Sequence, residues 1–346
     1  VARRLVDRFP DDEFIFLFDR PFDPPWLPSG NVKPVVAAPP ARHPLLWYAW
    51  FEWAVPMALQ RHRADVFFSP DGYCSLRSSV PTVMVTHDLA HLHFPEAVPG
   101  LVRRYYQYFV PKFLERAERI VAVSEYTARD IELQYGIPRQ KISVACNGCD
   151  PAFRPLSEAE KQRVREQYAR GLPYFFYIGA MHPRKNIPRL IAAFDQFKTN
   201  SGSPALLLLA GRMAWQTGEI RSAFDAAAHR NDIIFLGYVP DEVLPSLTGA
   251  ALALTYVSLF EGFGVPVLEA LHCEVPVLYS NISSMPEVAG EAGWPVNPHS
   301  EQSIAEGLSR LWSDDSLRRQ LTGQAAAQRA KFSWERAADV VAEVLR

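Results

Sequence analysis

The sequence predicts an α/β protein built from two Rossmann-like domains. Short β-rich runs alternate with helical patterns along nearly all of the 346 residues, which is typical of parallel sheets with crossover helices. The chain is also longer than one hydrophobic core ordinarily serves. The alternation breaks once, at residues 150–156, where two prolines precede a charged helical pattern at 157–170. We therefore place a domain boundary after residue 155.

The first domain, 1–155, is expected to contain five strands, each a short apolar or β-branched run. They are 13–18, 65–69, 82–86, 120–123 and 142–145. Helical patterns follow at 101–117 and 124–135. The aromatic-rich stretch 45–59, flanked by Arg42 and Arg61, has two interpretations. It is a buried helix of the first domain, which is the favoured one, or a helix that contacts a membrane surface.

The second domain, 156–331, repeats the alternation with a further set of five apolar runs. We expect strands at 174–178, 205–210, 233–236, 252–256 and 275–279. Helices are expected at 186–199, 221–230 and 304–312. In such folds ligands bind at the carboxyl ends of the strands, so the residues that follow each strand are the candidates for function.

Composition excludes several classes of protein. Lys and Arg number 36 against 38 Asp and Glu, a net charge of −2, which argues against a dedicated nucleic-acid binder. The sequence holds no apolar run of membrane-spanning length and no secretory signal. Four cysteines are too few for a disulfide scaffold and fit a reducing, cytoplasmic setting. The chain opens at Val1 inside a helical pattern, so we expect a preceding segment to be missing.

The motif SLFEGFGVPVLE, residues 258–269, carries the strongest functional signal. It follows a predicted strand, its two glycines allow tight turns and close approach of a ligand, and Pro266 suits the first position of a helix. A helix start presents unpaired N–H groups and the positive end of the helix dipole. The backbone at 263–265 is therefore predicted to cradle a diphosphate.

Two glutamates accompany this turn. Glu269 lies about one turn inside the predicted helix, and its side chain can lean back toward the helix start. An ionised carboxylate accepts hydrogen bonds, and a ribose diol offers two donors. Glu261, in the loop, is placed to meet a second hydroxylated group. A plain capped helix with acidic residues in its first turns explains Glu269 alone but not the whole constellation.

Two cations follow the first strand of the second domain. In GAMHPRKN, residues 179–186, Arg184 and Lys185 lie just before a predicted helix. Cations at a helix start oppose the helix dipole, which weakens the interpretation as a solvated surface pair. Two cations at this position can neutralise a diphosphate without a metal ion.

His87 and Asp88 follow a strand of the first domain, in THDLAHLHFPE. With His91 and His93 they offer metal-ligand chemistry, but Phe94 and Pro95 interrupt the helix that the spacing needs. We favour polar residues at a cleft and predict no metal site. Cys146 and Cys149 form an isolated C-x-x-C pair, and the sequence contains neither a G-x-G-x-x-G nor a P-loop motif.

Taken together, these motifs resemble the retaining glycosyltransferases of family four, the group 1 glycosyltransferases. The resemblance covers nearly the whole chain. Besides the Glu-x7-Glu motif it rests on YIGAMHPRKN, SEYTARDI, NGCD and SSMPEVAGEAG. It implies the GT-B fold, in which two Rossmann-like domains face each other across a cleft. It also implies that residues 332–346 form a helix that returns to the first domain.

The resemblance implies a role for each candidate residue and no metal or cofactor. Glu269 would bind the ribose, and Glu261 the donor sugar. Lys185 and Arg184 would bind the diphosphate, and His87 would lie on the acceptor side. The backbone positions expected in the donor site are Gly179, Gly237, Tyr238, Val239, Gly262, Phe263, Gly264 and Val265. Gly237, Tyr238 and Val239 would face the base.

Two departures accompany the resemblance. Ala180 stands where many members of the family carry Arg. The family's first strand and its Gly-rich loop have no counterpart, so we expect the chain to begin after them.

The overall pattern is closest to bacterial mannosyltransferase-like members that build polysaccharides. A GDP-mannose donor and a saccharide or lipid-linked acceptor are therefore expected, with contact at the periphery of a membrane. The alternatives are another GT-B enzyme of epimerase or phosphorylase type, and a non-catalytic sugar-nucleotide-binding protein.

Overall fold

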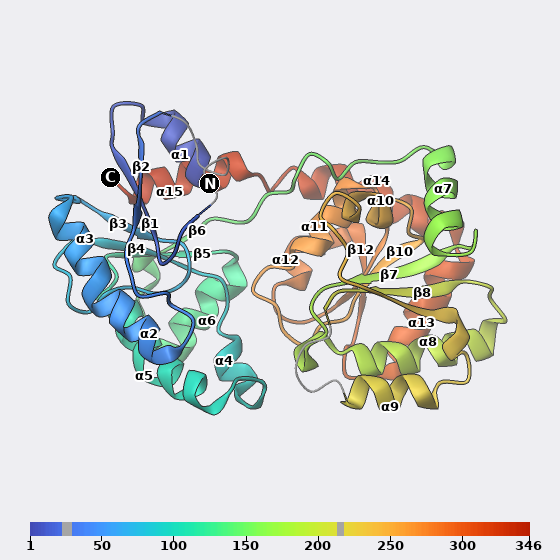
Figure 1. The fold of residues 1–346 in the computed structure, drawn as a ribbon. Helices are drawn as coiled ribbons and strands as arrows, with labels where there is room; N and C mark the ends of the chain where they lie inside the picture. Colours follow the sequence, from blue (N-terminus) through green and yellow to red (C-terminus); the bar gives the residue numbers. More distant parts are fainter. Residues whose placement is uncertain (23–29, 213–217) are drawn as a thin grey trace. The chain divides into compact units, whose positions relative to one another are not determined.

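The computed structural model describes residues 1–22, 30–212 and 218–346 (Figure 1). They form two compact units, one of Val1–Asn147 with Trp334–Arg346 and the other of Gly148–Ser333. The division falls eight residues before the expected boundary after 155, in the irregular segment that follows the last strand of the first unit. The final helix, α15 (Trp334–Val344), packs on α1 (Ala2–Arg8) in the first unit.

The first unit contains a four-stranded sheet, all parallel, in the order β3-β4-β5-β6. Its strands are β3 (Phe67–Ser69), β4 (Thr82–Thr86), β5 (Arg119–Ala122) and β6 (Ile142–Val144). A separate parallel pair joins β1 (Phe14–Phe18) to β2 (Val32–Val36). Sequence reasoning missed β2, because Pro34 lies inside a run of only five residues, and proline is tolerated in strands mainly at edges.

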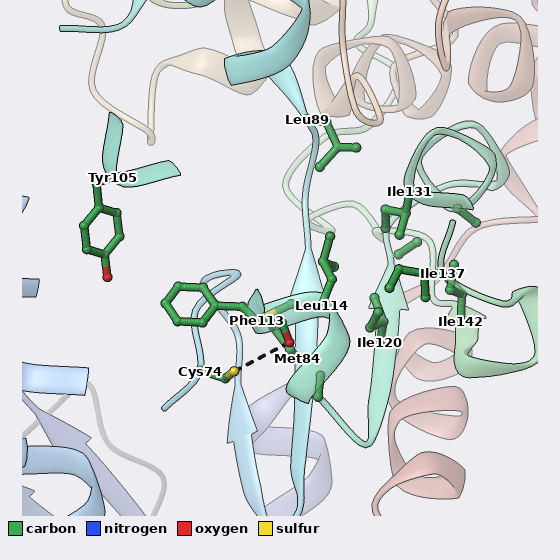
Figure 2. Close-up of a cluster of buried hydrophobic side chains, with 13 residues drawn as sticks. Cys74, Met84, Leu89, Tyr105, Phe113, Leu114, Ile120, Ile131, Ile137 and Ile142 are labelled. Carbon is green, nitrogen blue, oxygen red and sulfur yellow. Dashed lines mark hydrogen bonds between the residues drawn. The ribbon is translucent and has the colours of Figure 1, made fainter. Parts of the chain in front are cut away.

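Helices pack against this sheet around an aliphatic and aromatic core. They include α4 (Ala90–His93), α5 (Gly100–Arg116) and α6 (Glu125–Tyr135). Ser124 caps α6 by accepting a hydrogen bond from the Thr127 N–H, and Gly136 ends it in the left-handed conformation. Figure 2 shows the buried cluster that joins the sheet to these helices, with Met84 and Ile120 from the strands beside Phe113 and Ile131.

Residues 44–61 form a continuous helical stretch with a π turn in its middle. It consists of α2 (Pro44–Ala49), a π-helix (Trp50–Ala54) and α3 (Val55–Arg61). One face is buried in a cluster that includes Trp50, Phe51 and Leu59, so the prediction of a core helix is right for that face. The opposite face is exposed and is considered below.

The second unit has a six-stranded parallel sheet in the order β12-β11-β10-β7-β8-β9. Its strands are β7 (Tyr174–Ile178), β8 (Leu206–Ala210), β9 (Ile233–Gly237), β10 (Ala253–Tyr256), β11 (Val277–Ser280) and β12 (Gly293–Val296). This is the doubly wound order, in which the chain starts at β7, builds outward to β9, and returns to the other side of β7 with β10. The point where the order reverses therefore lies between β7 and β10.

Two helical layers cover this sheet (Figure 1). One layer contains α8 (Ile187–Ser201), α9 (Gly218–Ala226) and α13 (Glu301–Ser313). The other contains α10 (Leu244–Gly249), α11 (Val265–His272), α12 (Met285–Ala289) and α14 (Asp315–Arg329). The unit opens with α7 (Glu158–Tyr168), which begins with a capping box formed by Ser157 and Glu160. Within the described ranges, every helix is too short or too polar to span a bilayer.

Candidate active site

The fold brings the predicted cations and the loop glutamate together at the switch point of the second sheet. Arg184 and Lys185 lie in a 3₁₀ turn after β7, and Glu261 lies in the loop after β10, the neighbouring strand. The Arg184 Nη1 donates to Glu261 Oε2 at 2.8 Å, and the Lys185 Nζ donates to Glu261 Oε1. Ligands of doubly wound folds bind outside the strand ends at this point, so the three predicted residues share the place where a ligand is expected.

Backbone contacts fix the two loops to each other. The Leu259 N–H donates to Arg184 O at 2.8 Å, and the Arg184 guanidinium also donates to Phe260 O at 2.9 Å. Asn186, in the left-handed conformation, donates its amide to Val257 O at 3.0 Å. These hydrogen bonds hold the loop after β7, which contains Arg184 and Lys185, against the loop after β10.

Glu261 is buried and ionised between its two partners. Burial raises the pKa of the Glu261 carboxyl, but the charges of Lys185 and Arg184 outweigh it, so the pKa lies below its usual value. One carboxylate against two cations leaves the cluster with a net charge of about +1. An anion that approaches this cluster is attracted, although part of the positive charge is already neutralised.

Tyr256 completes the environment of Lys185 and was not identified from the sequence. The Lys185 Nζ donates to the Tyr256 hydroxyl at 2.9 Å. The Tyr256 ring stacks on Tyr177 at 6.3 Å between ring centroids. Burial raises the pKa of Tyr256 well above its usual value, so the hydroxyl stays neutral. As the last residue of an apolar strand, Tyr256 is indistinguishable by sequence from an ordinary core residue.

The glycine-rich turn lies where the motif predicts it, directly before α11. Gly264 is the N-cap of α11 with a φ of 96°, a conformation that favours glycine, and a proline occupies the first turn of the helix. The Ser284 hydroxyl lies within hydrogen-bond distance of Glu261 O at 2.9 Å and of Phe263 O at 3.0 Å. The Glu261 N–H donates to the Ser283 hydroxyl at 3.3 Å. Both serines belong to the SSMPEVAGEAG motif, but no role was predicted for them.

Glu269 lies in α11, mostly buried, next to other acids. Burial, followed by the charges of Asp150 and Asp241, raises the pKa of Glu269 to about 7. Asp150 is the last residue of the NGCD motif, which the fold thus brings beside α11. A carboxyl that changes charge near neutral pH is unusual and favours a functional role.

The predicted base-facing residues, Gly237, Tyr238 and Val239, lie at the carboxyl end of β9, next to the end of β8. The Gly211 N–H donates to Gly237 O at 2.7 Å, and the Gly179 N–H donates to Ala210 O at 3.0 Å. The carboxyl ends of β7, β8 and β9 are therefore hydrogen-bonded side by side. Tyr238 is exposed and lies beside the Arg212 guanidinium, 4.7 Å from the ring centroid.

A cavity of about 250 Å³ opens beside these strand ends. Its walls are mostly apolar and include Met181, Phe224, Phe235 and Gly237. Pockets for drug-sized ligands measure roughly 300–1,000 Å³, so this cavity suits one ring system of a larger ligand. A larger hollow of about 690 Å³ lies between α8, β12 and α13, lined by Trp294 and Arg310 among others. None of the predicted site residues lines it.

His87 lies in the first unit, at the carboxyl end of β4. It is exposed, and its Nε2 lies 2.8 Å from Pro70 O. The neighbouring histidines have other partners: His91 contacts the Tyr135 hydroxyl at 3.0 Å, and His93 contacts Asp130 at 2.8 Å. In the part of the chain that the structure describes, no three His, Cys, Asp or Glu side chains gather as a metal-ligand set.

Comparisons with known proteins bear on both units. Residues 158–328 match the family model described as "Glycosyl transferases group 1", and residues 2–153 match "Glycosyltransferase Family 4". The O-antigen chain mannosyltransferase B of Escherichia coli is 33% identical over 279 residues, which cover 80% of this chain and 73% of that protein. The O-antigen chain mannosyltransferase RfbU of Salmonella typhimurium is 27% identical over 273 residues, with coverages of 78% and 71%.

A solved structure shares the fold. The crystal structure of Anabaena Alr3699/HepE in complex with UDP and glucose superposes with a TM-score of 0.75 at 18% identity, covering 99% of this chain and 94% of that one. The four-stranded and six-stranded parallel sheets described above are those of the GT-B fold. The chain therefore belongs to the group 1, or family 4, glycosyltransferases, a family of retaining and metal-independent hexosyltransferases with the GT-B fold.

Proposed function

We propose that this enzyme transfers mannose from GDP-mannose to a saccharide or lipid-linked saccharide in polysaccharide biosynthesis. The observation that carries the proposal is the Arg184, Lys185 and Glu261 cluster at the switch point, beside the start of α11. A nucleoside diphosphate sugar is the donor that fits a cationic cluster next to a helix N-terminus. The choice of mannose is supported by the O-antigen mannosyltransferases among the relatives.

The proposed chemistry assigns each group a task in breaking the bond between sugar and diphosphate. Lys185 and Arg184 stabilise the charge that develops on the leaving diphosphate, and the turn from Gly262 to Val265 places backbone N–H groups beside it. The proposed route to retention is attack by the acceptor from the face that the diphosphate leaves, in which positioning and charge stabilisation carry the catalysis. Glu261, held by both cations, is proposed to bind the donor sugar.

The remaining tasks concern ribose, base and acceptor. Glu269 is proposed to accept hydrogen bonds from the ribose diol. The cavity beside Gly237, with the backbone of Tyr238 and Val239, is proposed to hold the base. His87 is proposed to act on the acceptor side. A lipid-linked acceptor would place the enzyme at the cytoplasmic surface of a membrane, and the four free cysteines fit that reducing side.

A binding titration followed by a transfer assay tests this proposal. The full chain is titrated with GDP, UDP, ADP and their sugar conjugates by calorimetry, with Glu269→Ala as the comparison. Selective binding of GDP that is lost in this variant is the expected result. Binding without turnover on any saccharide acceptor supports the non-catalytic alternative, release of a free epimer or a sugar phosphate supports the other GT-B enzymes, and no binding contradicts the donor site.

The pKa of Glu269 predicts a pH dependence of donor binding. With a pKa of about 7, the side chain is mostly neutral at pH 6 and mostly ionised at pH 8. Because the ionised form is the better acceptor for a diol, donor affinity is expected to rise about tenfold between these pH values. The same shift means that the free protein loses stability as pH rises from the ordinary value of 4.5 to about 7.

Calorimetry in buffers of different ionisation enthalpy measures the proton that binding releases. Glu269→Gln should remove the pH dependence, and Asp241→Asn should move it to lower pH by removing a like charge. A wild-type profile that is flat, or a Gln variant with an unchanged profile, contradicts the assignment of the ribose to Glu269.

Tyr256→Phe is expected to lower kcat about tenfold or more with little change in KM for the donor. The variant keeps the ring that packs on Tyr177 but removes an acceptor of the Lys185 ammonium, and a hydrogen bond to a charged group contributes about 1.5–3 kcal/mol. Tyr177→Phe is the matched control, since the Tyr177 hydroxyl contacts Ala180 O at 3.4 Å. Equal losses in both variants would show that the hydrogen bond from Lys185 to Tyr256 is not the cause of the loss.

A further inference from the structure

The exposed face of the helical stretch 44–61 is apolar where a surface helix is normally polar. Leu45 is 68% exposed, Trp53 is 53% exposed and Met57 is 63% exposed. The opposite face already packs in the core of the first unit, so the stretch is apolar all round while only half of it is covered. Single exposed apolar residues are ordinary, but a row of them marks an interaction site.

The exposed side chains follow one line along the stretch. Leu45, Tyr48, Trp53, Met57 and Arg61 are separated by three, five, four and four residues, and all five are exposed. The five-residue step crosses the π-helix Trp50–Ala54, whose wider turn adds one residue. Without that turn, Trp53 would rotate away from the line. The π-helix thus keeps Trp53 and Met57 on the same exposed face as Leu45 and Tyr48. A helix that served only the core would not need this alignment.

Helix α5 extends the same surface. Leu101 and Tyr108 are exposed on it, and the Lys112 ammonium lies 3.3 Å from the centroid of the Tyr108 ring. The two stretches adjoin, because α2 contacts α5 and the rings of Tyr48 and Phe109 lie 5.7 Å apart. We call this surface the aromatic–basic face: Leu45, Tyr48, Trp53, Met57, Leu101 and Tyr108 with the basic residues around them.

The charge around this face is mainly positive. Residues 42–63 and helix α5 together contain seven Lys and Arg residues against two acids, Glu52 and Glu115, although the whole chain has a net charge of −2. Glu52 is buried beneath the face and accepts a hydrogen bond from the Leu76 N–H at 2.9 Å. Arg77 adds a further cation over the Trp53 ring, at 4.7 Å. The face therefore presents aromatic and aliphatic side chains inside a basic rim.

We propose that the aromatic–basic face docks on the surface of an anionic lipid bilayer. Trp and Tyr favour the interface between water and acyl chains, and Arg and Lys attract acidic headgroups. A second copy of the chain fits less well, because a twofold contact would set the same basic rim against itself. The purpose of this docking would be to bring the enzyme to a lipid-linked acceptor, and that purpose rests on the function proposed above. The docking itself rests only on the aromatic–basic face.

Sedimentation of the full chain with vesicles tests the proposal. Vesicles of phosphatidylglycerol and phosphatidylcholine are compared with pure phosphatidylcholine over a salt series. The wild type is expected to pellet with the anionic vesicles and to be released by salt. Trp53→Ser with Met57→Ser should lower partitioning at least tenfold, and Arg61→Ser should lower it about fivefold and weaken the salt dependence. Leu133→Ser is the matched control, because Leu133 is 80% exposed on α6, outside the face.

The outcomes separate this proposal from the donor site. Nucleotide binding, measured on the same variants by calorimetry, should stay at the wild-type value because the substitutions lie in the first unit. Equal pelleting of the wild type and the double variant overturns the docking face and leaves the donor site untouched. Equal binding to neutral vesicles also overturns it. A concentration-dependent dimer that the double variant abolishes would assign the face to a second copy instead.

Discussion

Glu261→Gln is expected to lower transfer by a hundredfold to a thousandfold while nucleoside diphosphate binds more tightly than in the wild type. The change removes the carboxylate that the buried Lys185 and the half-buried Arg184 share. A diphosphate then supplies the missing charge, so product affinity rises about tenfold or more. Turnover falls because the cations lose the geometry that serves the departing group, and because they release the product slowly.

The same substitution should destabilise the free protein. Removing one partner of a buried ion pair typically costs about 3–5 kcal/mol, and glutamine recovers part of this by accepting one hydrogen bond. Denaturant unfolding with and without GDP measures the effect, and GDP should restore more stability to the variant than to the wild type. Glu274→Gln is the control, since its contact with Arg329 is exposed and is expected to contribute less than about 1 kcal/mol.

A fall in both transfer and nucleoside diphosphate affinity would contradict this account. That result would mean that Glu261 does more to hold the cations in place for the diphosphate than to neutralise them. Arg184→Gln distinguishes the two cases further. It removes one cation but keeps the pair between Lys185 and Glu261, so it should weaken nucleotide binding and leave the free protein more stable than Glu261→Gln.

The parts of the site that sequence reasoning identified carry a local signal. Arg184, Lys185 and Glu261 each follow a strand whose end is visible as an apolar run, and parallel strands place such ends on one edge. The glycine-rich turn is equally local, because Gly264 needs a backbone conformation that other residues resist. The order β12-β11-β10-β7-β8-β9, which makes β7 and β10 neighbours, had to come from the structure.

The missed residues depend on partners that are distant in the chain. Tyr256 is significant only because Lys185, 71 residues earlier, lies next to it, and Ser284 only because its hydroxyl reaches the backbone of the turn 21 to 23 residues earlier. The stretch 45–59 shows the same limit. Its composition predicts an apolar helix, but which face is buried depends on the rest of the first unit, and the π turn has no sequence signature.

Gly211→Ala is expected to produce the largest loss of stability among single methyl additions in the second unit. A Cβ on Gly211, whose φ is 138°, would lie 1.9 Å from the carbonyl oxygen of Gly179 and 2.7 Å from its carbon. Backbone atoms cannot yield as a flexible side chain does, so β7 and β8 must separate at their carboxyl ends. We expect a loss of about 4 kcal/mol, at the upper end of what single substitutions produce.

Gly202→Ala isolates the steric part of this effect. Gly202 ends α8 with a φ of 61°, and a Cβ there meets nothing within 4 Å. Its substitution should therefore lower the free energy of unfolding by only about 1 kcal/mol, the cost of placing alanine in the left-handed conformation. Thermal unfolding compares the two variants, and GDP titration below the transition tests the site. Because Gly179 begins the loop that carries Arg184 and Lys185, folded Gly211→Ala protein should bind nucleotide more weakly, whereas Gly202→Ala should bind it normally. Equal stability in the two variants would show that the strand ends can separate freely, and the close stacking of β7, β8 and β9 would then have no part in shaping the donor site.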